Sequence, residues 1–232
     1  LVFGGGYSPD DHDNYASRTS GDEVGNAIYI VNAVTGELVW SAGSSTDSVE
    51  RVADMKWAVP GGISVVDIDF DGKADHLYFG DLGGQVFRVD IDATGNNDHD
   101  VSRLASLGGS GSNHRRFYEA PAVGYVRDGV NTGFYVALAS GYRAHPLDES
   151  TREGLFVIKD KTPFNDVTEV VATTANMSNV SDGGLPSTDS RGWYYYFDRT
   201  GEKSMASPVI FDNRILLTTY SPVEIQNADN PC

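Results

Sequence analysis

The sequence predicts an all-β protein built from small repeated sheets, and three observations support this. Short runs of β-branched and aromatic residues alternate with clusters of Gly, Asn, Asp and Ser. No long segment shows the 3.6-residue hydrophobic period of an amphipathic helix. A pattern of three strands recurs along the chain, which is typical of repeat architectures. Because 40% of the 232 residues are hydrophobic, the chain can also bury a sizeable core.

The candidate strands are bounded by residues that favour turns. Each strand is short, rich in β-branched or aromatic residues, and flanked by Gly, Pro, Asn, Asp or Ser. In chain order they span residues 27–32, 36–40, 63–67, 76–80, 85–91, 120–126, 133–139, 154–159, 193–197, 207–211 and 214–220. The opening residues, 1–4, form a further candidate strand.

Three strand positions repeat in the same order along the chain. The first position follows small residues and often Pro, as in Ala58-Val59-Pro60, and the second follows a tight turn. The third contains a Gly, an aromatic residue and a polar end, and a Thr-Gly turn follows it at Thr35-Gly36 and at Thr94-Gly95. The most complete sets are 63–66, 76–80 and 84–90, and then 120–123, 134–138 and 154–160.

One such set is too small to bury both faces of its sheet, so successive sheets must stack. Radial stacking predicts a partial β-propeller with modified, quinoprotein-like blades, whose edges are short and protected. The alternative is a β-sandwich in which the repetition is coincidental. The expected divisions are the end of one blade, the blade that carries an acidic loop, a third blade and the start of the next, at residues 1–57, 58–117, 118–203 and 204–232.

Both ends of the sequence are expected to be cuts within a longer chain. The chain opens in a candidate strand without an initiator Met, and its single cysteine, Cys232, has no partner within it. One cysteine also excludes a zinc site of the Cys/His type.

The charge balance excludes several classes of function. There are 17 Lys and Arg against 33 Asp and Glu, a formal net charge of −16, so no nucleic acid is expected as a partner. No run of about 18 apolar residues exists that would cross a membrane. We find no nucleophile elbow, P-loop or dinucleotide fingerprint, and we therefore expect a protein that is not an enzyme.

The most specific motif is the acidic loop Asp67-Ile68-Asp69-Phe70-Asp71-Gly72-Lys73-Ala74-Asp75. Its carboxylates stand at loop positions 1, 3, 5 and 9, and a glycine that permits a sharp turn stands at position 6. Lys73 would supply its backbone oxygen at position 7, with its ammonium group toward solvent. Hard oxygen ligands in this number favour Ca²⁺ over Mg²⁺, which keeps more of its waters. The predicted metal ligands are therefore Asp67, Asp69, Asp71, Lys73 and Asp75.

This loop differs from a true EF-hand. An EF-hand has flanking helices and a Glu at position 12, whereas Tyr78 stands there and both flanks are candidate strands. The loop is therefore EF-hand-like and joins the first and second strands of a blade. Without a bidentate Glu, we expect a dissociation constant on the order of 10⁻⁶ to 10⁻³ M. The alternative is an acidic turn without an ion, its side chains bonded to local backbone N–H groups.

Other polar and aromatic clusters favour simpler interpretations. The acidic stretches 10–13 and 97–100 each contain a His and lie between candidate strands, so we interpret them as solvated loops. His114-Arg115-Arg116, Tyr118-Glu119 and the aromatic run 193–196 could line a ligand surface, but partial burial in the core is the favoured interpretation.

Residues 66–90, with the acidic loop at their centre, closely resemble the calcium-loop blade of the PilC/PilY family, which comprises large type IV pilus assembly factors and tip adhesins. Residues 1–7 and 25–36 look like that family's preceding blade, and Asn230-Pro231-Cys232 looks like the start of its next segment, where Cys232 would find a partner. The resemblance spans nearly the whole chain. It implies a C-terminal, modified propeller domain of a secreted bacterial protein at the outer-membrane surface or pilus tip.

The resemblance also implies a function. In that family, Ca²⁺ occupancy of the loop governs pilus extension against retraction, and hence twitching motility and attachment. The matching ligands are Asp67, Asp69, Asp71 and Asp75, with Lys73 through its carbonyl. The implied partners are minor pilins or other type IV pilus components, together with a host or abiotic surface.

Two other functions remain open from the sequence. Residues 25–40 share a Gly, Tyr, Thr-Gly, Trp pattern with quinoprotein dehydrogenases, but those enzymes bind pyrroloquinoline quinone and Ca²⁺ through separated ligands, and here the carboxylates are packed into one loop. An integrin-like or lectin-like propeller would bind protein or glycan ligands, and several of its blades would be expected to carry the calcium loop.

Overall fold

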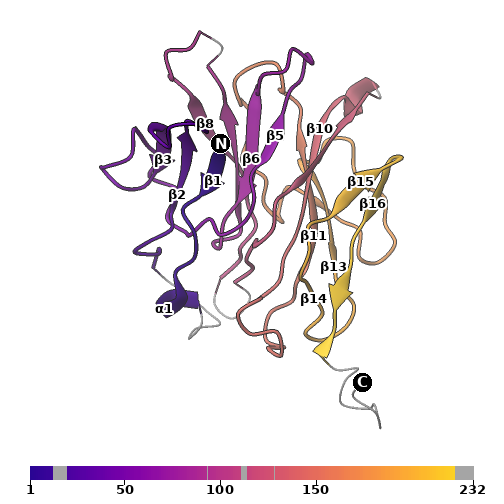
Figure 1. Cartoon of the computed structure of the whole chain (residues 1–232). Coiled ribbons are helices and arrows are strands. Elements are labelled where there is room, and N and C mark those ends of the chain that lie inside the picture. The colour runs from indigo at the N-terminus through magenta and orange to yellow at the C-terminus, as the bar shows by residue number, and fades with distance from the viewer. Residues whose placement is uncertain (13–19, 93, 111–113, 128, 223–232) are drawn as a thin grey trace.

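The computed structural model describes residues 1–12, 20–92, 94–110, 114–127 and 129–222 (Figure 1). In these ranges the only α-helix is α1 (Pro9–His12), and a 3-10 turn, η2, spans Gly129–Asn131. The all-β prediction is confirmed. No helix in the described ranges has the length and apolar character needed to cross a bilayer.

Three sheets follow one another along the chain, and each is mainly an antiparallel meander. The first contains β1 (Val2–Gly4), β2 (Ala27–Val31), β3 (Leu38–Gly43) and β4 (Glu50–Arg51), with β4 parallel to β3. The second contains β5 (Ser64–Val66), β6 (His76–Gly80), β7 (Gln85–Asp90) and β8 (Asp100–Ser106). The third contains β9 (Ala122–Val126), β10 (Gly133–Ala139), β11 (Gly154–Asp160), β13 (Gly192–Tyr196) and β12 (Ser178–Asn179), with β12 parallel to β13.

Two short ladders follow the third sheet. One pairs β15 (Val209–Phe211) with β16 (Arg214–Leu216), and the other pairs β14 (Lys203–Ser204) with β17 (Thr219–Tyr220). The first strands of successive sheets lie against one another, because β5 contacts β9 and β9 contacts β15. The sheets therefore stand side by side (Figure 1).

The predicted strands agree with these elements apart from a few differences. The sequence interpretation missed β8, whose residues Asp-Val-Ser-Arg-Leu-Ala-Ser contain no aromatic residue. Within its sheet this strand pairs with β7, and a parallel bridge between Ala105 and Ala172 covers part of its other edge. Its polar side chains are tolerated there because several remain partly exposed. The predicted strand 36–40 corresponds to β3, which begins two residues later and ends three residues later. The predicted strand 214–220 is divided into β16 and β17.

The second sheet is buried on both faces, since strand side chains alternate between its two sides. Leu77 and Phe79 of β6 pack with Trp40 in the cluster between the first and second sheets. Tyr78, between them in sequence, packs with Phe117 and other residues in the cluster between the second and third sheets. The elements that flank the acidic loop are thus fixed from both sides.

A buried ion pair also joins the second and third sheets. Arg88 in β7 and Asp160 at the end of β11 both have fully buried side chains, and Nη1 of Arg88 lies 2.9 Å from Oδ2 of Asp160. The hydroxyl group of Tyr78 donates to the same oxygen at 2.8 Å. Because each charge is desolvated, each depends on the other for compensation.

Breaking this pair is expected to destabilise the protein strongly. Asp160→Ala leaves the buried Arg88 guanidinium with Asp90 as its remaining carboxylate and removes the acceptor of Nη1 and of the Tyr78 hydroxyl group, so the free energy of unfolding should fall by about 3 kcal/mol. Urea denaturation measures the change. Asp100→Ala, at an exposed position at the start of β8, is the control and should cost less than about 0.5 kcal/mol. Equal losses for the two variants would contradict the prediction.

Glu153, just before β11, is a second buried charge, and its side chain makes stability depend on pH. It is 1% exposed, and burial raises its pKa to about 7, although Ser140 and the nearby Arg115, Arg116 and Lys203 lower it. The folded state therefore favours the protonated carboxyl. That contribution is complete below the pKa of the unfolded chain and is lost as the pH rises through 7.

The free energy of unfolding should accordingly fall between about pH 5 and about pH 9. Glu153→Gln should reduce this loss by roughly 3 kcal/mol, because the amide never ionises. Urea denaturation across this pH range measures it. Glu50→Gln in β4, where the side chain is exposed, should follow the wild-type curve. An unaltered pH dependence in Glu153→Gln would show that another group is responsible.

Candidate metal centre

The acidic loop, residues 67–75, joins β5 to β6 at one end of the second sheet. The last residue of the loop, Asp75, is held by backbone hydrogen bonds on both sides. Asp75 N donates to Val66 O at 2.8 Å, and Ile91 N donates to Asp75 O at 2.8 Å. The loop therefore begins and ends at backbone positions that the two hydrophobic cores fix.

Three of the four predicted carboxylates converge. One oxygen from each of Asp67, Asp69 and Asp71 lies within 4.8 Å of the other two. Hydrogen bonds within the loop orient the carboxylates: Gly72 N donates to Asp67 Oδ2 at 2.9 Å, and Asp71 N donates to Asp69 Oδ1 at 3.1 Å. The turn requires φ values of +62° at Phe70 and +87° at Gly72. Glycine adopts this conformation without steric cost.

One oxygen in this group is buried and unsatisfied. Asp67 Oδ1 has no hydrogen-bond partner among the described residues, whereas Asp67 Oδ2 is bonded to Gly72. Leaving a buried carboxylate oxygen unpaired costs free energy, and two further carboxylates of like charge lie beside it. Oxygen donors of this kind and number fit a hard divalent cation such as Ca²⁺.

The other two predicted ligands are placed differently. Asp75 lies outside the three-carboxylate group, and its Oδ2 accepts a hydrogen bond from Ile68 N at 2.5 Å. The ammonium group of Lys73 was expected to point to solvent. Its side chain is 82% exposed, but its ammonium turns back to Asp71 Oδ2 at 3.1 Å. Hydrogen bonds from the Lys73 backbone and ammonium lower the pKa of Asp71, and the Asp71 hydrogen bond raises the pKa of Lys73.

The sequence also contains a partial second copy of the loop's spacing, which the sequence interpretation missed. Residues 90–98 have Asp at positions 1, 3 and 9 and Gly95 at position 6. This turn is satisfied internally, because Asp92 accepts hydrogen bonds from Thr94 N and the Thr94 hydroxyl, which lower its pKa to about 2. Asp90 is paired with Arg88 at 2.7 Å. The carboxylates of this turn therefore do not form a convergent group like the one at residues 67–71.

The interpretation of the two His-containing stretches as solvated loops is wrong for their histidines. His99 is buried, accepts a hydrogen bond from Asp92 N at 2.9 Å and lies edge-on to Trp40. His12 is also buried and lies 2.9 Å from Asp22 Oδ2. Asp13 lies outside the described residues. Residues 10–12 belong to α1 and Asp100 begins β8, so neither stretch is wholly a loop, and both histidines are buried inside the protein.

The remaining clusters are largely structural, as the sequence indicated. His114, Arg115 and Arg116 are all buried, and Arg116 Nε donates to His12 Nδ1 at 3.2 Å. In the aromatic run of β13, Tyr194 belongs to the core between the second and third sheets, while its neighbours are only partly buried.

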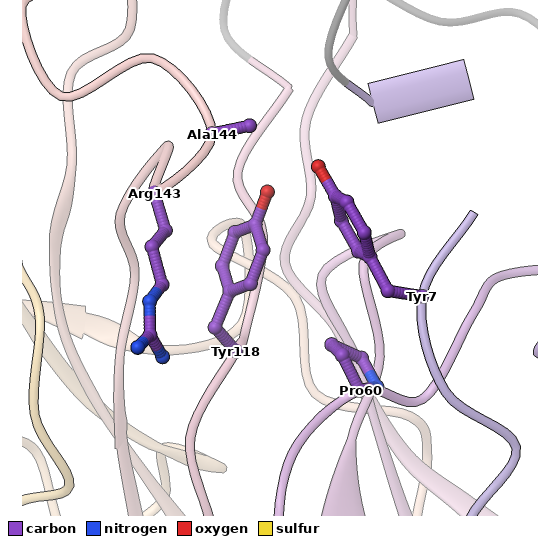
Figure 2. Close-up of a pocket in the computed structure, with 5 residues that line it drawn as sticks. All are labelled: Tyr7, Pro60, Tyr118, Arg143 and Ala144. Carbon is purple, nitrogen blue, oxygen red and sulfur yellow. The ribbon is translucent and has the colours of Figure 1, made fainter. Parts of the chain in front are cut away.

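A small pocket opens where segments adjoining all three sheets meet (Figure 2). Its volume is about 290 Å³, and it is lined by Tyr7, Pro60, Tyr118, Arg143 and Ala144. The rings of Tyr7 and Tyr118 contact each other, with centroids 6.2 Å apart, and their hydroxyl groups point to the same side of the pocket. Arg143 donates to Glu119 at 2.8 Å. The lining thus offers aromatic ring surface and hydroxyl groups to a ligand. The positive charge of Arg143 is already compensated by Glu119.

The chain is similar to a curated protein and to a solved structure. No family model matches the chain. A protein of Xylella fastidiosa (strain Temecula1 / ATCC 700964), described as a type IV pilus biogenesis factor PilY1 homolog, is 25% identical over 252 residues. The similarity covers 95% of this chain but only 16% of that protein.

The crystal structure of the Pseudomonas aeruginosa PilY1 C-terminal domain has a similar fold, with a TM-score of 0.65 at 19% sequence identity. The match covers 88% of this chain and 52% of that one. Sequence and fold therefore agree with the resemblance found in residues 66–90: the chain is similar in sequence to a PilY1 homolog and in fold to the C-terminal domain of PilY1.

Proposed function

We propose that this chain is a calcium-binding domain of a type IV pilus-associated surface protein. In this proposal it has no catalytic role. It supports pilus assembly, the control of extension against retraction, twitching motility and surface attachment. Its partners are minor pilins or other pilus components, and its location is the bacterial surface or pilus tip. The similarity to a PilY1 homolog, described as a pilus biogenesis factor, supports the pilus association.

The arrangement of Asp67, Asp69 and Asp71 is the observation that carries the calcium proposal. Their oxygens converge within 4.8 Å, and Asp67 Oδ1 is buried without a partner in the described structure. A Ca²⁺ ion would compensate the three charges and satisfy that oxygen. Asp75, through Oδ1, and the Lys73 carbonyl would complete the predicted ligand set.

We further propose that the three sheets are consecutive blades of a β-propeller. Each sheet is a four- or five-stranded unit with mostly antiparallel pairing, and the first strands β5, β9 and β15 lie against one another in order. Stacking of this kind shares one core between each pair of blades, as the two hydrophobic clusters do here. The blade limits at 57/58, 117/118 and 203/204 stay predictions.

Calorimetric titration with Ca²⁺ tests the site. The wild-type protein should bind one ion with a dissociation constant on the order of 10⁻⁶ to 10⁻³ M. Asp67→Ala removes the carboxylate that bridges the turn, and Asp75→Ala removes the ligand at position 9. Each variant should weaken binding at least tenfold, which corresponds to about 1.4 kcal/mol.

The matched control is Asp92→Ala, in the turn that repeats the spacing but satisfies its own carboxylate. This variant should bind Ca²⁺ like the wild type, and Mg²⁺ should bind the wild type more weakly than Ca²⁺ does. If a folded wild-type protein binds no Ca²⁺, or if Asp92→Ala impairs binding as much as Asp67→Ala does, the proposed site is wrong.

Lys73→Gln should change the affinity in the opposite direction. The substitution keeps the backbone carbonyl at position 7 but removes an ammonium group that contacts Asp71 and competes with the ion for its charge. Ca²⁺ binding should tighten about threefold at low ionic strength and less at high salt, because the charges are exposed. Weaker Ca²⁺ binding by Lys73→Gln would contradict this prediction and mean that the ammonium group stabilises the binding geometry of the loop.

A further inference from the structure

His76 connects the acidic loop to the interior of the protein. It directly follows Asp75, begins β6 and is 7% exposed. The backbone of Asp75 is bonded on both sides, to Val66 and to Ile91. The position of Asp75 in the loop and the position of His76 in the sheet are therefore set by the same short length of backbone.

The imidazole ring of His76 links two groups that are distant in sequence. Its Nδ1 lies 2.8 Å from Oδ1 of Asp90 at the end of β7. Its Nε2 lies 2.5 Å from the carbonyl oxygen of Pro163, in the segment that follows β11 of the third sheet. The ring thus bridges the second sheet to the third at the end where the acidic loop lies.

Arg88 holds the same segment from a neighbouring position. Its guanidinium contacts Asp90 at 2.7 Å and donates to Asp160 at 2.9 and 3.0 Å. It also donates to the carbonyl oxygens of Thr162 at 3.0 Å and Asn165 at 2.7 Å. Residues 160–165 are therefore attached to the second sheet by Arg88 and His76, which share Asp90, and by the hydroxyl group of Tyr78, which donates to Asp160.

We propose that His76 couples cation binding in the acidic loop to the junction between the second and third sheets. An ion that fixes the position of Asp75 also restricts the backbone of His76, the next residue. The contacts of the His76 ring with Asp90 and Pro163 are then stronger. The junction of residues 160–165 is thereby stabilised when the ion is bound. His76 acts as a positioning residue and does not touch the ion. The inference rests on the proposed calcium site and adds its structural consequence.

The coupling must be reciprocal, because two linked equilibria share one free energy. If the ion stabilises the junction, weakening the junction must weaken ion binding by the same factor. Asp160→Asn removes a charge from the junction on the third sheet, while Asp160 is not among the predicted ion ligands. It should weaken Ca²⁺ binding about fivefold, which is the lower end of typical coupling energies.

Amide hydrogen exchange with and without Ca²⁺ tests the coupling directly. In the wild-type protein, Ca²⁺ should slow exchange both in the loop, residues 68–75, and at the junction, residues 161–166. In His76→Gln the loop should still be protected by Ca²⁺, while the added protection at the junction should disappear. His145→Gln, at an exposed histidine, is the matched control and should behave like the wild type. Mg²⁺ at the same concentration controls for ionic strength.

The outcomes separate this inference from the proposed site. Protection of the loop by Ca²⁺ with no change at residues 161–166 would overturn the coupling and leave the calcium site intact. Absence of Ca²⁺ binding by calorimetry would overturn both. If His76→Gln does not fold, the wild-type exchange data and the Asp160→Asn affinity decide, and a wild-type affinity in a folded Asp160→Asn protein would contradict the coupling.

Discussion

The buried ion pair between Arg88 and Asp160 is the constraint on which much of the structure depends. The two residues lie in different sheets, and Arg88, together with the Tyr78 hydroxyl group, compensates the fully buried Asp160 carboxylate. Apolar packing alone is non-directional and tolerates small sliding movements between neighbouring sheets. The guanidinium adds direction, because it binds two carboxylates and two backbone carbonyls at defined angles. The second and third sheets are thereby held in one fixed position relative to each other.

The candidate metal centre uses this rigid framework. Its carboxylates lie on a short exposed loop, which by itself would be mobile and self-repelling. The loop, however, closes between β5 and β6, and β6 is buried on both faces by alternating side chains. The framework thus fixes the ends of the loop while its centre stays accessible to solvent. In the proposed function, a Ca²⁺ ion bound there could exchange with the surroundings without exposure of the core.

Local patterns in the sequence predicted local structure well and long-range contacts poorly. Residues 76–80 and 133–139 were predicted with the bounds that the structure has, because β-branched and aromatic residues dominate them. The convergence of Asp67, Asp69 and Asp71 also follows from spacing within one turn. By contrast, Arg116 contacts His12 across 104 positions, and His76 contacts Pro163 across 87. No periodicity encodes such partners, so both histidines could be understood only from the folded chain.

The two turns with the same spacing show what decides whether a run of aspartates is available to a cation. At residues 67–71 one oxygen from each carboxylate lies within 4.8 Å of the other two. At residues 90–98 the first aspartate is paired with Arg88, the second accepts hydrogen bonds from Thr94, and Thr94 takes the place of the third. Carboxylates that are already paired with a basic side chain or bonded to a hydroxyl group thus remove a turn from this chemistry. Within a family of such repeats, acidic spacing alone therefore does not identify the turns that could hold a cation. A count of acidic motifs would overstate the number of cation sites that such repeats can offer.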